Sequence, residues 1–259
     1  EPACGSGRLL ESLAARGHAV HGFDLNRHQL AFAKARLRAK GLAAQVWRDR
    51  LEDFRVPRGV RYDLVHCLVS TFKYIQTQAG AVRCLRRMAG ALRPGGILLL
   101  GLHLTDYRHR VSDHERWIGR RPGVRVVSDT WSAPAIRASR TEAMRTRMRI
   151  TERGRTRVEE TVWTFRTYSP TELRALLRQV PALRLLGCHD FRYDLSAPRK
   201  LDMSYSDIIL VLRRAWAGSR RLSPASGGAN LPPCSPPSAL GSLVLAARAR
   251  PPSPPWRST

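Results

Sequence analysis

The sequence predicts an α/β fold built on a doubly wound, mostly parallel sheet, and three observations support this prediction. Helix and strand patterns alternate through residues 1–104. A turn containing Gly5 and Gly7 is followed by Asp24, which ends the next apolar run. Residues 97–104 are almost all aliphatic, as in a central parallel strand that is covered on both faces.

The opening segment of the chain has the composition of a loop that binds a nucleoside. Gly5 and Gly7 allow a tight turn and a close approach of the backbone to a ligand. A helix that begins there points free N–H groups at the same place. Asp24 has a carboxylate that can accept both hydroxyls of a ribose. A dinucleotide loop has a third glycine where this chain has Leu10, and the acidic Glu1 favours a ligand with a positive amine over a pyrophosphate.

The other elements follow from apolar spacing and from residues that begin or end helices. Asn26 is a helix N-cap and Gly41 a helix end, and Ser169-Pro-Thr-Glu172 is a capping box with proline in the first turn. The last strand is expected to be antiparallel. Helices are predicted over residues 9–16, 27–40, 79–92 and 172–179, and strands over residues 18–24, 44–47, 62–68, 97–104, 183–189 and 207–213.

Residues 124–168 differ from the rest because β-branched, aromatic and arginine residues alternate along them. They predict a small antiparallel sheet, with a turn at residues 152–155, over the open end of the main sheet. The domain is expected to span residues 1–214, with this antiparallel insertion over its active site. Residues 215–259 are rich in proline, serine and arginine and lack acidic residues, which predicts a disordered tail.

The formal net charge of +25 would attract nucleic acid or an anionic surface. Most basic residues are arginines scattered along the chain, which favours biased composition over a nucleic-acid site. No apolar run approaches the roughly 20 residues of a membrane span. The five cysteines have no C-x-x-C spacing, which indicates reduced thiols and a cytoplasmic protein. Asp113-His114-Glu115 is interpreted as a solvated loop, and no metal site is predicted.

Several landmarks occur in an order that resembles the class I S-adenosylmethionine (SAM)-dependent methyltransferases, which have a Rossmann-like fold. The resemblance covers residues 1–213 and implies SAM as the cofactor. Its landmarks are Glu1–Arg8, Asp24, Asp49 after the strand predicted at 44–47, Tyr62-Asp-Leu-Val65 in the strand at 62–68, Leu68–Ile75, Leu92-Arg-Pro-Gly-Gly96 before the strand at 97–104, and Tyr168–Leu173.

The start of the chain departs from this pattern. It begins with glutamate at what should be the end of a buried strand. We therefore expect an N-terminally clipped chain, in which the first strand, the central member of the sheet, is nearly all missing. The N-terminal helix that often covers SAM in this family is also expected to be absent.

The resemblance assigns the methionine and ribose parts of SAM to the first two landmarks. Glu1, Ala3, Gly5 and Gly7 would line the methionine moiety. Asp24 would bind the ribose hydroxyls.

The adenine and the transferred methyl group are assigned to three later positions. Leu25 would pack beside the adenine, Asp49 would accept a hydrogen bond from its amino group, and Arg50 and Leu51 would flank the ring. Leu68 would lie near the methionine amine and the methyl group. For the two leucines beside the ring, packing in the core is an equally good interpretation.

Methyl transfer needs in-line positioning of the acceptor, and a general base only where the acceptor must lose a proton. His103, near the end of the strand predicted over residues 97–104, is the candidate base. The sequence is also explained by a histidine that only lines the pocket and takes no part in catalysis. Tyr74 is a second catalytic candidate. Thr71, Phe72, Tyr74 and Tyr107 would shape the acceptor pocket.

The function predicted from the sequence is methyl transfer from SAM to a small-molecule acceptor. One alternative is an RNA or DNA methyltransferase, which the net charge suggests. Against it, Leu68-Val-Ser-Thr71 stands where amino-methylating nucleic-acid enzymes have an Asn/Asp-Pro-Pro-aromatic motif. The other alternative is a degenerate SAM-binding protein without catalysis. The sequence leaves open the acceptor, the methylated atom and the oligomeric state.

Overall fold

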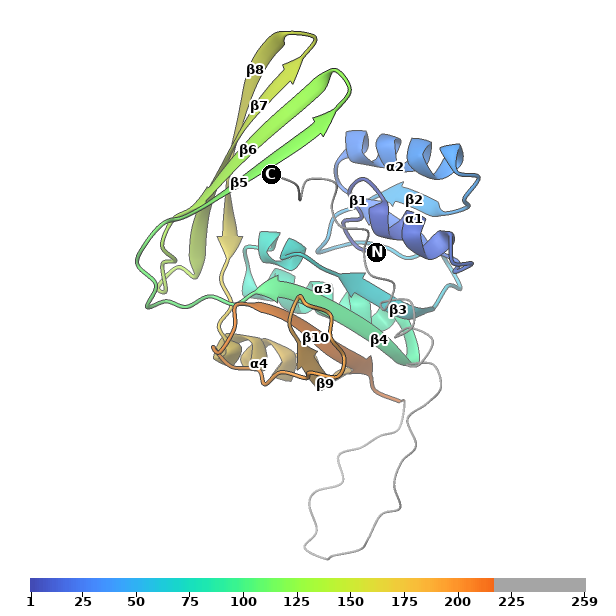
Figure 1. Cartoon of the computed structure of the whole chain (residues 1–259). Helices are drawn as coiled ribbons and strands as arrows, with labels where there is room; N and C mark the ends of the chain where they lie inside the picture. Colours follow the sequence, from blue (N-terminus) through green and yellow to red (C-terminus); the bar gives the residue numbers. More distant parts are fainter. Residues whose placement is uncertain (217–259) are drawn as a thin grey trace, which may run out of the picture.

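The computed structural model describes residues 1–216 of the chain and arranges them in three sheets flanked by helices (Figure 1). The helices are α1 (Arg8–Ala14), α2 (Arg27–Ala39), η1 (Thr71–Tyr74), α3 (Gln78–Ala91) and α4 (Pro170–Arg178). The strands are β1 (His21–Asp24), β2 (Gln45–Arg48), β3 (Tyr62–Cys67), β4 (Leu92–His103), β5 (Asp113–Arg121), β6 (Val124–Ser132), β7 (Thr141–Glu152), β8 (Arg155–Arg166), β9 (Leu183–His189) and β10 (Asp207–Arg214).

The main core lies on a four-stranded sheet with the order β3-β4-β10-β9. β3 and β4 are parallel, while β10 is antiparallel to both of its neighbours, as predicted for the last strand. The aliphatic run in β4 supplies Leu98, Leu100 and Leu102, all fully buried. Leu85 and Met88 of α3 pack in the same core. The α/β fold class predicted from the sequence is confirmed.

The parallel part of the sheet is divided in two. β1 and β2 form a separate parallel pair, packed on α1 and α2 through a second apolar cluster. Glu1–Cys4 run along the other edge of β1, where Pro2 bridges Phe23 and the Cys4 N–H donates to the Phe23 carbonyl over 2.8 Å. This short segment occupies the place of the predicted central strand. Among the described residues it forms only the Pro2–Phe23 bridge, and the β1–β2 pair and the main sheet stay separate.

Strands β5–β8 form an antiparallel meander that projects from the body (Figure 1). The sequence predicted this insertion to begin at residue 124, which is wrong: β5 precedes it, so Asp113-His114-Glu115 begins a strand rather than a loop. β5 is an edge strand exposed along its whole length, so no apolar alternation marked it. The predicted turn at 152–155 is present, with positive φ at Arg153 and Gly154.

The base of the insertion is fixed to the body by polar contacts. The Lys73 ammonium, only 2% exposed, lies 2.9 Å from the Glu142 carboxylate on β7. The Arg166 guanidinium donates to the Gln76 carbonyl over 2.8 Å. A buried charge is tolerated when it is paired and hydrogen-bonded. These contacts hold the meander in a fixed position over the ends of β3 and β4.

The capping box and the final strand of the domain occur where the sequence predicts them. Ser169 and Glu172 form the predicted capping box at the start of α4, and β10 ends at Arg214. Residues 217–259 of the predicted tail, including Cys234, lie outside the described residues. Among the residues described, no helix is both long enough and apolar enough to cross a membrane. The four described cysteines are buried and free.

Candidate functional site

Asp24 and the glycine loop meet at the carboxyl end of β1. One oxygen of the Asp24 carboxylate accepts the Gly5 N–H at 2.8 Å, and the other accepts the Asn26 N–H at the same distance. Gly5 and Gly7 have φ of 51° and 70°. Nothing lies within 4 Å of where a Cβ would stand on Gly5. Each carboxylate oxygen has a second lone pair, so Asp24 retains acceptor capacity toward a ligand beside the loop.

Glu1 lies at the same place with an unsatisfied carboxylate. Its Oε2 is buried and has no hydrogen-bond partner among the described residues. Burial is the main cause that raises the pKa of the Glu1 carboxyl to about 7; the nearby Asp24 charge acts in the same direction, while the adjacent ammonium and a hydrogen bond from the Leu10 backbone oppose it. A carboxylate that is buried without a partner is costly. A cationic ligand at this point would remove that cost.

The residues assigned to the adenine occupy different environments. Leu25 is 51% exposed, beside the Asp24 carboxylate, and is free to cover a flat ring. Leu51 instead packs partly against the main core. The Asp49 carboxylate accepts the Arg50 and Arg55 N–H groups, each at 2.8 Å, which orders the loop after β2. Arg50 is exposed.

The loop after β3 bends sharply onto β4. Val69 and Ser70 both have positive φ, 54° and 62°. The Ser70 N–H donates to the Gly101 carbonyl over 3.1 Å, and its Oγ accepts the His103 N–H at 2.9 Å. A Cβ on Gly101 would lie 3.1 Å from a methyl group of Leu68. This close approach fixes Leu68 and His103 at the carboxyl ends of neighbouring strands.

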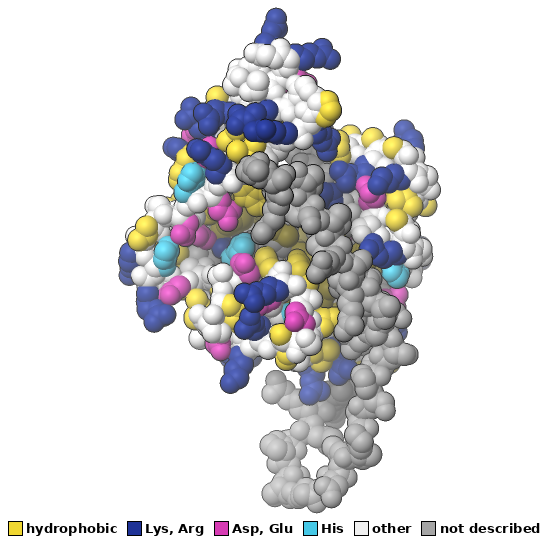
Figure 2. Space-filling model, in the orientation of Figure 1, with side chains coloured by type: hydrophobic (Ala, Val, Ile, Leu, Met, Phe, Trp, Pro, Cys, Tyr) yellow, Lys and Arg dark blue, Asp and Glu magenta, His cyan; other side chains and the backbone are white. Residues whose placement is uncertain are grey.

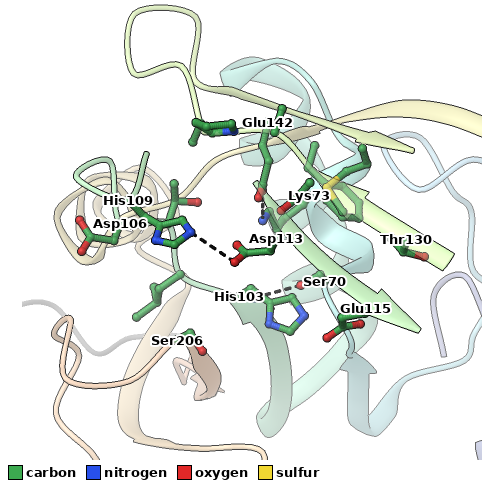
Figure 3. Close-up of a pocket in the computed structure, with 18 of the residues that line it drawn as sticks. Ser70, Lys73, His103, Asp106, His109, Asp113, Glu115, Thr130, Glu142 and Ser206 are labelled. Atoms are coloured by element: carbon green, nitrogen blue, oxygen red, sulfur yellow. Dashed lines mark hydrogen bonds and ion pairs between the residues drawn. The ribbon is translucent and has the colours of Figure 1, made fainter. Parts of the chain in front are cut away.

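A cavity of about 780 Å³ opens at this edge, between the ends of β3 and β4 and the base of the β5–β8 meander (Figure 3). We call it the acceptor cavity. Among the residues that line it are Ser70, Lys73, His103, Thr105, Asp106, His109, Asp113, Glu115, Glu142, Trp163, Phe165 and Asp207.

The three histidines that line the acceptor cavity are each paired with a carboxylate, and the His114 Nε2 lies 3.0 Å from the Asp129 carboxylate. His103 Nδ1 contacts the Asp207 carboxylate at the start of β10, which leaves its Nε2 free to face a ligand. His109 Nε2 lies 3.2 Å from the Asp113 carboxylate (Figure 3). A carboxylate on one ring nitrogen orients the ring and sets which nitrogen carries the proton. The His103–Asp207 pair therefore has the geometry of a proton acceptor.

The aromatic residues proposed for the acceptor pocket lie elsewhere. Phe72 is fully buried against Tyr168 in the main core. Tyr74 is half exposed, packs edge-on against Phe165 and is not among the lining residues of the acceptor cavity. The Tyr107 hydroxyl bonds to Thr167 and lines a separate cavity of about 590 Å³. Thr71 starts η1 and does not line the acceptor cavity. Thr71, Phe72 and Tyr74 belong to the 3₁₀ turn η1, and of that turn only Lys73 lines the acceptor cavity, which the sequence did not reveal.

Several lining residues were missed or misread in the sequence. Lys73 is the only charged residue in its turn, and this could have indicated that its side chain lines a site. Asp207 begins an apolar strand, and pairing that strand antiparallel to residues 97–104 brings it to His103. Asp113 and Glu115 were noted but placed in a loop. Among the described residues, no three His, Cys, Asp or Glu side chains converge as a metal site would require.

Comparisons with known proteins identify the class. Residues 1–96 match the family model described as "Methyltransferase domain". This match, together with the fold, confirms the resemblance to class I SAM-dependent methyltransferases: residues 1–96 carry a methyltransferase domain, and the described chain has the fold of that class.

Curated methyltransferases of known sequence resemble part of this chain. A ubiquinone biosynthesis O-methyltransferase of Pseudomonas savastanoi is 30% identical over 93 residues, 36% of this chain and 38% of the relative. The putative methyltransferase YqeM of Bacillus subtilis is 28% identical over 103 residues, 39% of this chain and 40% of the relative. The chain thus spans about two-fifths of the length of these curated relatives.

Solved structures resemble a larger part of the chain. A SAM-dependent methyltransferase from Clostridium acetobutylicum gives a TM-score of 0.67 at 16% identity, covering 83% of this chain and 82% of that one. CalS10, an amino pentose methyltransferase from Micromonospora echinaspora, gives 0.63 at 21% identity, covering 83% and 81%. The sugar N-methyltransferase KedS8 from Streptoalloteichus gives 0.65 at 20% identity, covering 83% and 78%. At these identities the likeness establishes the fold.

The packing of the glycine loop against α2 predicts unequal effects of two glycine substitutions. Gly7 and Gly17 both have positive φ, so alanine at either position should cost about 1–2 kcal/mol of backbone strain. At Gly7 a Cβ would also lie 2.9 Å from the Ala33 Cβ, whereas nothing lies within 4 Å at Gly17. Urea unfolding should show a larger decrease in the free energy of unfolding for Gly7→Ala than for Gly17→Ala. Equal decreases would contradict the close packing of Gly7 against Ala33.

Proposed function

We propose that the protein transfers a methyl group from SAM to a small-molecule acceptor. The observation that carries this proposal is the hydrogen bond between the Gly5 N–H and the Asp24 carboxylate. It joins the loop and the strand end that would hold the two halves of a sulfonium nucleoside. The acceptor cavity begins at the loop that follows the carboxyl end of β3. The family match over residues 1–96 supports the proposal independently.

The residues at the loop fit SAM in charge and shape. Glu1 would hold the methionine ammonium, which would give its orphaned carboxylate oxygen a partner. Asp24 would accept the ribose hydroxyls with its remaining lone pairs, and the exposed Leu25 would cover the adenine. Ala3, Gly5 and Gly7 would line the methionine, while Asp49, Arg50 and Leu51 would border the ring and Leu68 the methyl group. Bound SAM would supply a methyl group already activated by its positive sulfur.

The acceptor side requires positioning and, for some acceptors, a place for a proton. The base of the meander covers one side of the acceptor cavity. His103, held by Asp207, would take the proton from an acceptor that must lose one. An unchanged kcat in His103→Gln would contradict this role. The free buried cysteines agree with a reducing compartment, and we infer a cytoplasmic protein.

Methylation of nucleic acid is the second candidate, and one observation favours it. Arginines gather on the outer end of the β5–β8 meander, more closely than their spread along the sequence suggested (Figure 2). The acceptor cavity opposes it, because its carboxylates would repel phosphates. Sequence-specific, saturable binding of RNA or DNA that persists at high salt would support this alternative, since counterion-driven binding falls steeply with salt.

The Asp24→Ala variant tests the proposed cofactor site. It removes a charge-assisted acceptor, so SAM binding measured by calorimetry should weaken by about 1–3 kcal/mol. Asp63→Ala is the matched control, because the Asp63 side chain is 77% exposed on β3 and lies outside the site. Unchanged affinity in Asp24→Ala would refute the assignment. Absence of SAM binding by the unaltered chain would refute the proposed enzyme altogether, including its degenerate SAM-binding alternative.

The raised pKa of Glu1 predicts a pH-dependent affinity for SAM. Below a pKa of about 7 the Glu1 carboxyl is mostly protonated and does not attract the ligand's ammonium; above it the carboxylate does. SAM affinity should therefore rise about tenfold from pH ~5.5 to ~7.5, a range in which an α-amino group stays largely protonated. Glu1→Gln should flatten this dependence, and Glu159→Gln, on the exposed meander, should preserve it. A pH dependence retained in Glu1→Gln would contradict the role of this carboxylate.

A further inference from the structure

We propose that the acceptor is an organic amine that enters the cavity as a cation, so that the methylated atom is nitrogen. This inference rests on the proposed function and specifies its substrate class. It is carried by the balance of charges around the acceptor cavity, by an unsatisfied buried hydroxyl, and by aromatic faces in the cavity wall.

The lining of the acceptor cavity is opposite in sign to the chain as a whole. The formal net charge of the chain is +25. The cavity, however, is lined by five carboxylates and one ammonium group, with no arginine. Figure 2 shows acidic and histidine side chains grouped near the base of the meander, away from the arginines at its outer end. The five carboxylates belong to Asp106, Asp113, Glu115, Glu142 and Asp207.

Only part of this negative charge is neutralised within the protein. Lys73 pairs with Glu142, and Arg108 pairs with Asp106 from outside the cavity. The other three carboxylates have no Lys or Arg partner within ion-pair distance among the described residues. Asp113 contacts His109, Asp207 contacts His103 and accepts a hydrogen bond from the Ser206 hydroxyl, and Glu115 accepts from a tryptophan N–H. The protein therefore leaves a surplus of negative charge facing the cavity.

A second observation points independently to a polar ligand. Thr105 lines the acceptor cavity and is only 7% exposed, yet its Oγ1 has no hydrogen-bond partner among the described residues. A buried hydroxyl without a partner is costly. As an acceptor it would receive an N–H from a ligand ammonium.

The cavity wall also offers aromatic surface to a cation. Trp163 and Phe165 lie on β8 with their ring centroids 5.9 Å apart, edge to face. The Lys73 ammonium already lies 5.0 Å from the centre of the Phe165 ring, so the protein uses this face for a positive charge. Aromatic faces attract organic cations more than neutral ligands of the same shape. The carboxylates and the aromatic faces both favour a cationic ligand over a neutral one.

The chemistry of an amine acceptor makes use of the His103–Asp207 pair. An ammonium has no lone pair, so it must lose a proton before it reacts; His103 Nε2 accepts that proton, and Asp207 stabilises the imidazolium. The freed nitrogen lone pair forms the new N–C bond while the C–S bond breaks and its electron pair stays on sulfur. The product ammonium carries the positive charge that the sulfonium loses. Atoms and charge are balanced without a further reactant.

A matched pair of probes tests the selectivity. Cyclohexylamine, which is protonated at neutral pH, and cyclohexanol have nearly the same shape and differ in charge. With the full chain saturated with S-adenosylhomocysteine, the amine should bind at least tenfold more tightly than the alcohol in a ligand-observed NMR titration. Glu115→Gln and Asp113→Asn should each reduce this preference severalfold. Glu159→Gln, which removes the same charge on the exposed part of β8, should leave it unchanged.

The outcomes separate this inference from the proposed function. Equal affinity for the two probes, or binding of neither by a protein that binds SAM, would overturn the amine assignment and leave SAM-dependent methyl transfer standing. A preference that survives in Glu115→Gln and Asp113→Asn would also overturn it, since these carboxylates carry the argument. Failure to bind SAM would instead overturn the proposed function itself.

Discussion

The hydrogen bonds of the Asp24 carboxylate are the constraint on which the site depends. They connect the glycine loop before α1 to the turn after β1, two segments that belong to different elements and carry different parts of the proposed nucleoside site. They act together with the backbone hydrogen bonds from the Cys4 N–H to the Phe23 carbonyl and from the Gly7 N–H to the Cys4 carbonyl to fix the direction of the loop. They also join the segments that carry Glu1 and Leu25, the residues that we propose contact the methionine and the adenine.

The electrostatic arrangement of the molecule is uneven. Arginines are concentrated on the outer meander, where solvent screens them, while carboxylates line the acceptor cavity under the base of the same sheet. The Lys73–Glu142 ion pair lies at the boundary and also fixes the meander to η1. This ion pair thus holds the meander on the body and also neutralises part of the negative charge that lines the acceptor cavity. A net charge calculated for the whole chain conceals this division.

The sequence predicted those features that short-range chemistry determines. The Asn26 cap and the Ser169–Glu172 capping box were identified at their positions, because each depends on its neighbours in the chain. The aliphatic part of β4 was also identified, but the strand begins at Leu92 and not at residue 97. β5 was missed because an edge strand exposed on both faces has no apolar period. The His103–Asp207 contact joins residues 104 positions apart and depends on the register of β10 against β4, which local patterns do not encode.

The two points where the meander leaves and rejoins the body are adjacent. The Thr105 N–H donates to the Tyr168 carbonyl over 2.9 Å, so the chain enters and exits the insertion through neighbouring residues. Closing a loop whose ends already touch costs little additional entropy as its length changes. The meander can therefore be lengthened, shortened or exchanged during evolution while the nucleoside half keeps its structure. Such an arrangement lets one catalytic scaffold acquire new acceptors by replacing a single contiguous segment of its gene.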